Sequence, residues 1–322
     1  MNKVLFSADK TVYKANLHCH TTVTDGEYTP EETKKNYMAN GYGIVAYTDH
    51  RVLCGYSYLN DENFLALHGC EMDIKNKMSK MPGYKNYKYK QYHFNLIATD
   101  ENITHTPPMP SMDYDDIDAI NQYIKDRSDE GFLVCYNHPY WSMQTSLDFG
   151  ELRGCFAMEI YNHSCEMYGY YGYNPQAYDE MLRTGHKLYC VSADDNHNAN
   201  ITRRKQIQNA LFNADFDSFG GFTMINSDSL KYRDVINALK QGDFYASQGP
   251  EIYKISLYSN VLSVACSDVT QMVIYNDGID CWVKSGQIFN NAEFTLKGDE
   301  KYIRVTCRDV NHKDANSVAY WL

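Results

Sequence analysis

The sequence predicts an α/β fold followed by a small all-β region, and two observations carry this prediction. Over residues 1–249, short apolar runs alternate with amphipathic segments, a pattern typical of strands and helices in a largely parallel sheet or barrel. After residue 249, turn residues separate short apolar runs without a convincing helix, which indicates a small β-sandwich-like domain. We therefore predict two domains, 1–249 and 250–322.

The strands are predicted from short runs rich in β-branched and aromatic residues. In the first domain these runs are 16–20, 43–50, 64–71, 92–98, 132–138, 156–162, 187–194 and 206–212. In the second domain they are 251–258, 261–267, 271–276, 280–284, 292–297, 302–309 and 317–322. The lysine- and tyrosine-rich stretch 75–92 is expected to form a loop or hairpin before the next strand.

The helices are predicted from their end signals. Thr29, Pro30 and Glu32 supply an N-cap, a proline at the first helical position and a capping-box glutamate, and Gly41 closes the segment. Three further helices are expected at 115–130, 174–185 and 229–241, each followed or closed by a glycine.

Composition indicates a folded protein and narrows its class. Hydrophobic residues make up 43% and charged residues 22% of the chain, as in ordinary globular proteins. No apolar run is long enough to span a membrane and no signal-peptide pattern opens the chain, so we expect a cytoplasmic protein without a membrane partner. Ten cysteines without a CxxC pair are expected to be reduced thiols. The net charge of −11 disfavours a long nucleic-acid surface but leaves room for a small anionic substrate.

Candidate metal ligands gather at the ends of the predicted strands, where six of the eleven histidines lie. His18 and His20 are two positions apart, so on a strand their side chains leave the same face. Because parallel strands end at one mouth, we expect the ligands to converge. Imidazoles combined with carboxylates suit zinc, manganese, iron or cobalt. The candidate ligands are His18, His20, Asp25, His50, Glu71, His93, His138, Asp195 and His197.

These segments resemble a known family. HCHTTVTDG, YTDH, the glutamate of HGCE, YHFNLIA, NHP and DDNH are similar, in order, to the successive motifs of the PHP (polymerase and histidinol phosphatase) superfamily, over about residues 14–249. The resemblance implies a distorted (β/α)7 barrel with two or three divalent ions, which would be manganese, iron or zinc. The C-terminal strands resemble the small β-domain of one subgroup of stand-alone PHP proteins.

The resemblance also implies a division of the ligands among three metals. The first would take His18, His20, Glu71 and Asp195. Glu71 would bridge to a second metal, which His93 and His138 also bind. The third would take Asp25, His50 and His197, and some family members carry histidine where this chain has Asp25. Among these residues the expected catalytic ones are Glu71, His138, Asp195 and His197.

The implied activity is hydrolysis of a phosphate ester by a metal-activated hydroxide. The favoured substrate is a small phosphomonoester, such as a sugar phosphate or nucleotide. The alternatives are a phosphodiesterase or exonuclease on short nucleic acid and, from another class, a metal-stabilised, non-catalytic binding scaffold. The β-domain would cover the active-site mouth, mediate dimerisation or bind carbohydrate; the sequence leaves these roles and the oligomeric state open.

Residues near the motifs supply candidate substrate contacts. Phosphate oxygens would be bound by a basic residue of the set Arg51, Arg203, Arg204 and Lys205. Tyr140 and Trp141 follow the NHP motif and would stack on a base or sugar, or else pack in the core. Asp194 would assist protonation of the leaving group through a water molecule, although strand alternation favours a side chain that is solvated and turned away from the metals.

Overall fold

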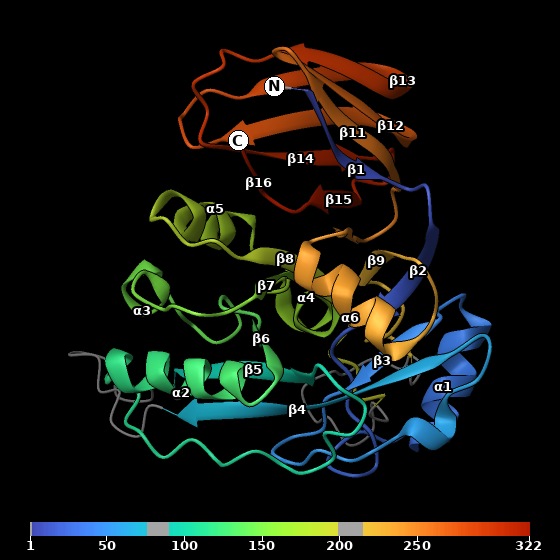
Figure 1. Cartoon of the computed structure of the whole chain (residues 1–322), viewed down its shortest axis with the longest axis vertical. Coiled ribbons are helices and arrows are strands. Elements are labelled where there is room, and N and C mark those ends of the chain that lie inside the picture. The colour runs from blue at the N-terminus through green and yellow to red at the C-terminus, as the bar shows by residue number, and fades with distance from the viewer. Residues whose placement is uncertain (1, 76–89, 199–214) are drawn as a thin grey trace.

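The computed structural model describes residues 2–75, 90–198 and 215–322, and these form a mixed α/β protein (Figure 1). The strands are β1 (Asn2–Ser7), β2 (Thr11–Asn16), β3 (Ile44–Tyr47), β4 (Leu65–Lys75), β5 (Gln91–Ala98), β6 (Phe132–Tyr136), β7 (Ala157–Asn162), β8 (Tyr189–Ala193), β9 (Phe222–Ser227), β10 (Phe244–Ser247), β11 (Ile252–Tyr258), β12 (Val261–Asn276), β13 (Trp282–Thr295), β14 (Tyr302–Arg308), β15 (Asp314–Ser317) and β16 (Tyr320–Trp321). The helices are α1 (Pro30–Ala39), η1 (a 3-10 turn, Ser57–Leu59), α2 (Ile117–Asp129), α3 (Ser146–Phe149), α4 (His163–Gly169), α5 (Pro175–Arg183) and α6 (Tyr232–Gln241).

The helix ends follow the sequence signals. The amide of Glu32 donates to the Thr29 hydroxyl at 3.2 Å and the amide of Thr29 donates to the Glu32 carboxylate at 2.9 Å, which confirms the capping box of α1. At the end of α6, Gly242 adopts a left-handed backbone with φ of 70°, where a side chain would add strain. The expected helices at 115–130, 174–185 and 229–241 are confirmed, each shorter than its segment.

The expectation of a largely parallel sheet is wrong at β5. Strands β2, β3 and β4 pair in parallel, as do β6, β7 and β8, but β5 runs antiparallel to both β4 and β6. The physical reason is visible at His93, which lies near the start of β5 opposite Asp73 of β4. Only a reversed strand brings a residue at its beginning to the edge where the parallel strands end.

A closed (β/α)7 barrel is not confirmed. The path of paired strands runs from β2 to β8 and ends there, and helices do not follow every strand within the described residues. The segments after β2 and β8 nevertheless contact each other. The amide of Asp195 donates to the carbonyl of His18 at 2.9 Å, and the amide of His20 donates to the carbonyl of Asn196 at 3.1 Å.

The core of the α/β region lies between the sheet and its helices. Ile120 and Ile124 on the inner face of α2 belong to one buried cluster with Phe94 and Val134 of the sheet. Burial of such side chains stabilises the fold by roughly 1.5–3 kcal/mol each.

None of the helices in the described part of the chain combines the length and the apolar character that a membrane crossing needs. The predicted strand at 206–212 and most of the stretch 75–92 lie outside the described residues.

The C-terminal strands form the upper part of the molecule in Figure 1. β12 is one long strand where two were expected, because its irregular register between Ala265 and Val269 bends it without breaking it. β1, which was not predicted, pairs antiparallel with β11, and β15 pairs with β10. The sheet is therefore continuous from one region to the other. The domain boundary near residue 250 stays a prediction.

Candidate metal centre

The segment that carries the first two histidines differs from its prediction. β2 ends at Asn16, so His18 and His20 follow the strand, and the expected strand at 16–20 is wrong. The segment instead pairs through its backbone with residues 195–196 on one side and with Thr48, directly after β3, on the other. Both imidazoles are fully buried, with ring centroids 5.1 Å apart. The two rings therefore converge from a short segment whose backbone is held by hydrogen bonds on both sides.

Glu71 of β4 lies at the centre of the site, with its carboxylate 1% exposed. One oxygen, Oε1, lies 2.7 Å from His93 Nδ1 and 3.4 Å from the Nε2 atoms of His18 and His138. The other oxygen, Oε2, lies 2.8 Å from His50 Nδ1. One buried carboxylate thus faces imidazoles on several sides, which is the position that a bridging ligand requires.

Asp195 completes the buried part of the cluster. Its Oδ1 atom lies 3.2 Å from His18 Nε2 and 3.1 Å from His20 Nε2, and its Oδ2 atom lies 3.9 Å from His138 Nε2. The backbone of both Asp195 and His138 has positive φ, at 54° and 27°. Non-glycine residues rarely adopt such angles, which cost about 1–3 kcal/mol each and cluster at functional sites.

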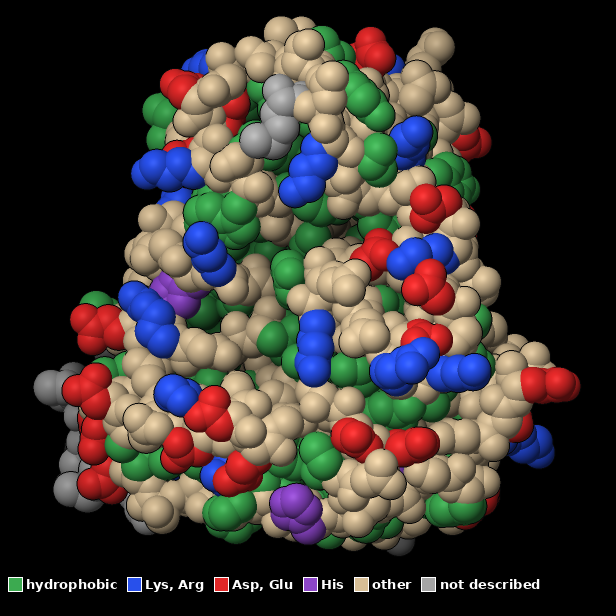
Figure 2. All heavy atoms as spheres, in the orientation of Figure 1, with side chains coloured by type: hydrophobic (Ala, Val, Ile, Leu, Met, Phe, Trp, Pro, Cys, Tyr) green, Lys and Arg blue, Asp and Glu red, His purple; other side chains and the backbone are tan. Residues whose placement is uncertain are grey.

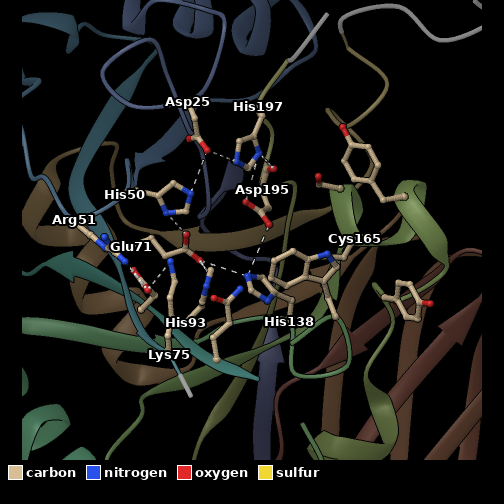
Figure 3. A pocket seen from close by; sticks show the side chains of 16 residues that line it. Asp25, His50, Arg51, Glu71, Lys75, His93, His138, Cys165, Asp195 and His197 are labelled. Atoms are coloured by element: carbon tan, nitrogen blue, oxygen red, sulfur yellow. Dashed lines mark hydrogen bonds and ion pairs between the residues drawn. The ribbon is translucent and has the colours of Figure 1, made fainter. Parts of the chain in front are cut away.

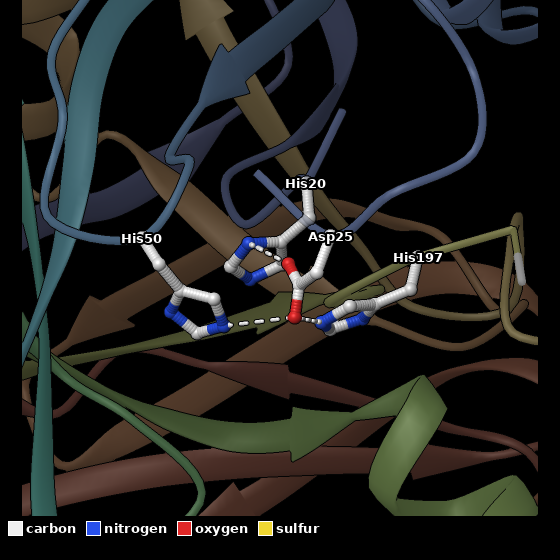
Figure 4. A group of neighbouring side chains, drawn as sticks. All are labelled: His20, Asp25, His50 and His197. Atoms are coloured by element: carbon white, nitrogen blue, oxygen red, sulfur yellow. Dashed lines mark ion pairs between the residues drawn. The ribbon is translucent and has the colours of Figure 1, made fainter. Parts of the chain in front are cut away.

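A second group surrounds Asp25 nearer the surface (Figure 4). The Asp25 Oδ2 atom lies 3.5 Å from His50 Nε2 and 3.6 Å from His197 Nε2, and its Oδ1 atom lies 3.8 Å from His20 Nδ1. The Asp25 side chain is 53% exposed. His20 thus contacts both groups, whereas the family resemblance assigns it to the first metal only.

All nine predicted residues come together in one cluster. Within the described residues, four overlapping groups offer donor atoms that lie within 4.8 Å of one another. The groups are His20, Asp25, His50 and His197; His18, His138 and Asp195; His18, His20 and Glu71; and Glu71, His93 and His138. Whether each residue binds a metal stays a prediction.

Glu159 of β7 is a site residue that sequence reasoning missed. It is fully buried, its Oε1 atom lies 2.7 Å from His18 Nδ1, and its Oε2 atom accepts from the His138 amide at 3.0 Å. A carboxylate on Nδ1 fixes the imidazole tautomer and leaves the Nε2 lone pair for a metal. The signal available in the sequence was one acidic residue inside the otherwise uncharged strand run AMEIYN. Similarly, the side-chain Nδ2 of Asn137 donates to Glu71 Oε1 at 3.0 Å.

The electrostatics of the cluster favour positive charge at His18 and His50. Burial opposes a proton on His18, but Asp195, Glu159 and Glu71 outweigh burial and raise its pKa. Burial likewise opposes charge on His50, yet hydrogen bonds to Asp25 and Glu71 raise its pKa to about 10. A field that holds extra protons on imidazoles also attracts divalent cations.

The residues fit metal ions of borderline softness. Two buried ring nitrogens, His20 Nδ1 and His93 Nε2, have no hydrogen-bond partner among the described residues, and such orphaned atoms cost free energy unless a ligand uses their lone pairs. The Nε2 atoms of His18 and His20 face each other at 3.1 Å. Imidazole with carboxylate is the donor set of zinc, manganese and iron sites.

A pocket of about 840 Å³ opens onto the cluster (Figure 3). Seven of the nine candidate ligands line it, namely Asp25, His50, Glu71, His93, His138, Asp195 and His197. Arg51 also lines it and forms a two-pronged ion pair with Asp73, with Nη2 2.7 Å from Oδ2. Lys75, another lining residue, lies 3.4 Å from the same carboxylate and was not among the predicted contacts. Arg203, Arg204 and Lys205 lie outside the described residues.

Asp194 is not solvated, contrary to expectation. Its side chain is fully buried and accepts hydrogen bonds from the amides of Phe219, Gly220 and Gly221 and from the hydroxyl of Tyr37. Burial raises its pKa to about 7 even though these hydrogen bonds oppose the rise. The expected direction, away from the metal ligands, is correct, but the role is to hold the 219–221 loop.

Eight of the ten free cysteines are buried, as expected, whereas Cys54 is half-buried and Cys281 is exposed.

Comparison with known proteins finds similar solved structures at low sequence identity. No protein-family model and no curated protein matches the sequence. The chain is similar to a two-domain protein from Bacteroides vulgatus ATCC 8482 that contains a predicted PHP-like metal-dependent phosphoesterase, with 14% identity, a TM-score of 0.47, and coverage of 100% of this chain and 97% of that one. A protein from Bifidobacterium adolescentis ATCC 15703, provisionally described as a metal-dependent phosphoesterase, has 12% identity and a TM-score of 0.36 over 56% of this chain and 86% of its own.

Proposed function

We propose that this protein is a metal-dependent phosphomonoesterase. The observation that carries the proposal is a set of overlapping histidine and carboxylate groups beside one pocket, in which His18, His20, Glu71 and His138 each belong to two groups. Overlapping groups of this kind suit adjacent metal ions, and adjacent ions suit in-line displacement at phosphorus. The order of the motifs in the sequence supports the same reaction class.

The chain's own residues would hold the ions and position the substrate. Glu71 would bridge two ions, with His93 and His138 on one side and His18, His20 and Asp195 on the other. Asp25, His50 and His197 would hold a third. When bound, divalent ions polarise phosphoryl oxygens and acidify water. In the overall reaction, the bond from phosphorus to the ester oxygen breaks, water supplies the new oxygen on phosphorus, and the leaving alcohol gains a proton.

Charge around the pocket supports a small anionic substrate. Arg51 and Lys75 share Asp73, so this part of the lining keeps one net positive charge. On the face shown in Figure 2, lysine and arginine side chains are interspersed with aspartate and glutamate. Nucleic acid binding depends on clustered positive charge, whereas one local cation is enough for a single phosphate group.

The test is an activity panel with defined metals. Protein stripped of metal and reloaded separately with manganese, iron or zinc should hydrolyse phosphomonoesters faster than bis(p-nitrophenyl) phosphate or a short oligonucleotide. Glu71→Gln, loaded in the same way, is the control for contaminating phosphatase. Faster cleavage of the diester or oligonucleotide would replace this proposal with the phosphodiesterase, and failure to hydrolyse any ester while retaining metal would favour the binding scaffold.

A further inference from the structure

Three aromatic side chains, Trp141, Tyr168 and Tyr171, line the pocket and form what we name the aromatic wall. Trp141 is 39% exposed and Tyr171 is 43% exposed, so neither residue is a core residue. Tyr140, which packs edge-on against Tyr171 at 5.1 Å between ring centroids, extends the exposed aromatic surface. Exposed aromatic side chains that line a polar pocket are a mark of a binding site.

The aromatic wall begins directly beside the candidate metal ligands. The ring centroid of Trp141 lies 5.0 Å from that of His138 and 5.8 Å from that of His93. A phosphate on the cluster would therefore have its ester substituent within reach of the indole. The substituent, and not the phosphate, is the part of a substrate that this surface can contact.

Hydrogen bonds tie the aromatic wall to the cluster. Asn162 donates to Asp195 Oδ2 at 3.1 Å and accepts from the Cys165 amide at 2.9 Å, so it fixes the start of α4, the helix that carries Tyr168. On the other side, the amide of Ser142 donates to the carbonyl of His138 at 3.1 Å and closes the turn that holds Trp141. A preformed surface loses little entropy when a ligand packs against it.

The two sides of the pocket differ in chemistry. In Figure 3, Arg51 and Lys75 lie on one side of the cluster and Cys165 of α4 lies on the other. The volume of about 840 Å³ is within the range of pockets that hold a drug-sized ligand and exceeds the need of a phosphate group alone. A substrate with an anionic end and a flat apolar end matches both sides.

We propose that the substrate is a phosphomonoester whose alcohol carries a planar ring, either a nucleobase or an aryl group, and that this ring stacks on the aromatic wall. The inference rests on the proposed phosphomonoesterase function and assigns Trp141 as its main specificity residue. Stacking of a base on an aromatic side chain contributes an affinity factor of about 10 to 100. The ring-bearing ester should exceed its ring-free counterpart in kcat/KM by that factor.

The decisive experiment compares two esters that differ only in the base. Metal-loaded protein should hydrolyse adenosine 5′-monophosphate with a kcat/KM about 10-fold or more above that for ribose 5-phosphate. Trp141→Ala should bring this ratio close to one, and Trp141→Phe should preserve most of it. Tyr258→Ala, which removes an aromatic side chain of similar exposure on β11, should leave the ratio unchanged. Benzyl phosphate distinguishes a nucleobase from an aryl group as the ring that binds. A kcat/KM as far above that for ribose 5-phosphate as the kcat/KM for the nucleotide would show that the aromatic wall binds aryl groups in general.

A binding measurement keeps this inference separate from the proposed function. Adenosine, which has no phosphate, should quench the tryptophan fluorescence of the wild type, and Trp141→Phe should remove most of that quenching. Ribose 5-phosphate hydrolysed as well as the nucleotide, or a ratio unaffected by Trp141→Ala, would overturn the stacking proposal and leave the phosphatase intact. Quenching without hydrolysis of any ester would overturn the phosphatase while retaining the ring-binding wall.

Discussion

The two halves of the candidate metal centre differ in their exposure to solvent. The inner half, around Glu71 and Asp195, has side chains at most 11% exposed. The outer half, around Asp25 and His50, has side chains 53% and 31% exposed. Electrostatic interactions are stronger where water is excluded. If these residues bind metal ions as proposed, we expect the inner ions to be held tightly and the outer ion to exchange with solvent.

The largest expected effect comes from the centre of the inner half. Glu71→Gln should lower kcat at least about 100-fold, because the neutral amide cannot bridge two cations. His138→Ala, which removes a neighbouring donor, should have an effect of the same order. Metal content measured by mass spectrometry and unfolding followed by circular dichroism would separate lost metal from lost fold. Near wild-type turnover in a fully loaded Glu71→Gln protein would rule out the bridging role.

A smaller effect is expected at the residue that positions an inner ligand. Glu159→Gln keeps the size and shape of the side chain but weakens its hydrogen bond with Nδ1 of His18. Metal affinity, measured by competition with a chelating dye, should fall about 10-fold to 100-fold. Asp73→Asn at the edge of the pocket is a matched carboxylate control that should leave metal affinity within about threefold. An equal loss in both variants would show that general charge, not tautomer control, is responsible.

The outer half should respond differently to the same kind of substitution. Asp25→Asn should lower activity about 10-fold at limiting metal, with most of the loss restored by excess metal, because an exposed site exchanges its ion with solvent. Titration of activity against metal concentration measures this rescue. Glu71→Gln should show no such rescue. If excess metal also failed to restore the activity of Asp25→Asn, the two halves would not differ in how readily they exchange metal with solvent.

The smallest effect is expected from mild chelation of the wild type. A weak chelator should remove the outer ion first, with a minor decrease in melting temperature, and the inner ions only later, with a larger decrease. Stoichiometry by mass spectrometry and calorimetric melting would be followed on the same samples. Loss of all ions in a single phase would contradict the division into an inner and an outer half.

The sequence predicted which side chains converge better than it predicted the sheet. His18 and Asp195 are recognisable because residue type and motif order carry the chemistry, and neither depends on knowing the strand direction. The reversal of β5 and the pairing of β1 with β11 were missed, since local periodicity does not encode a partner far away in the chain. Glu159 was missed because a single acidic residue in an apolar strand has no pattern to mark it.

The contact between the segments after β2 and β8 has a consequence for the order of folding. The side chains of Asn16 and Asn196, 180 positions apart in the sequence, form a hydrogen bond of 3.0 Å beside the backbone pairing of His18 with Asp195. Contacts between such distant residues form slowly, because a long chain must first be brought together. During synthesis on a ribosome, His18 and His20 therefore cannot reach their final positions until residue 196 has emerged. We therefore expect metal to bind late and to stabilise a chain that has already folded. Metal binding should not nucleate folding.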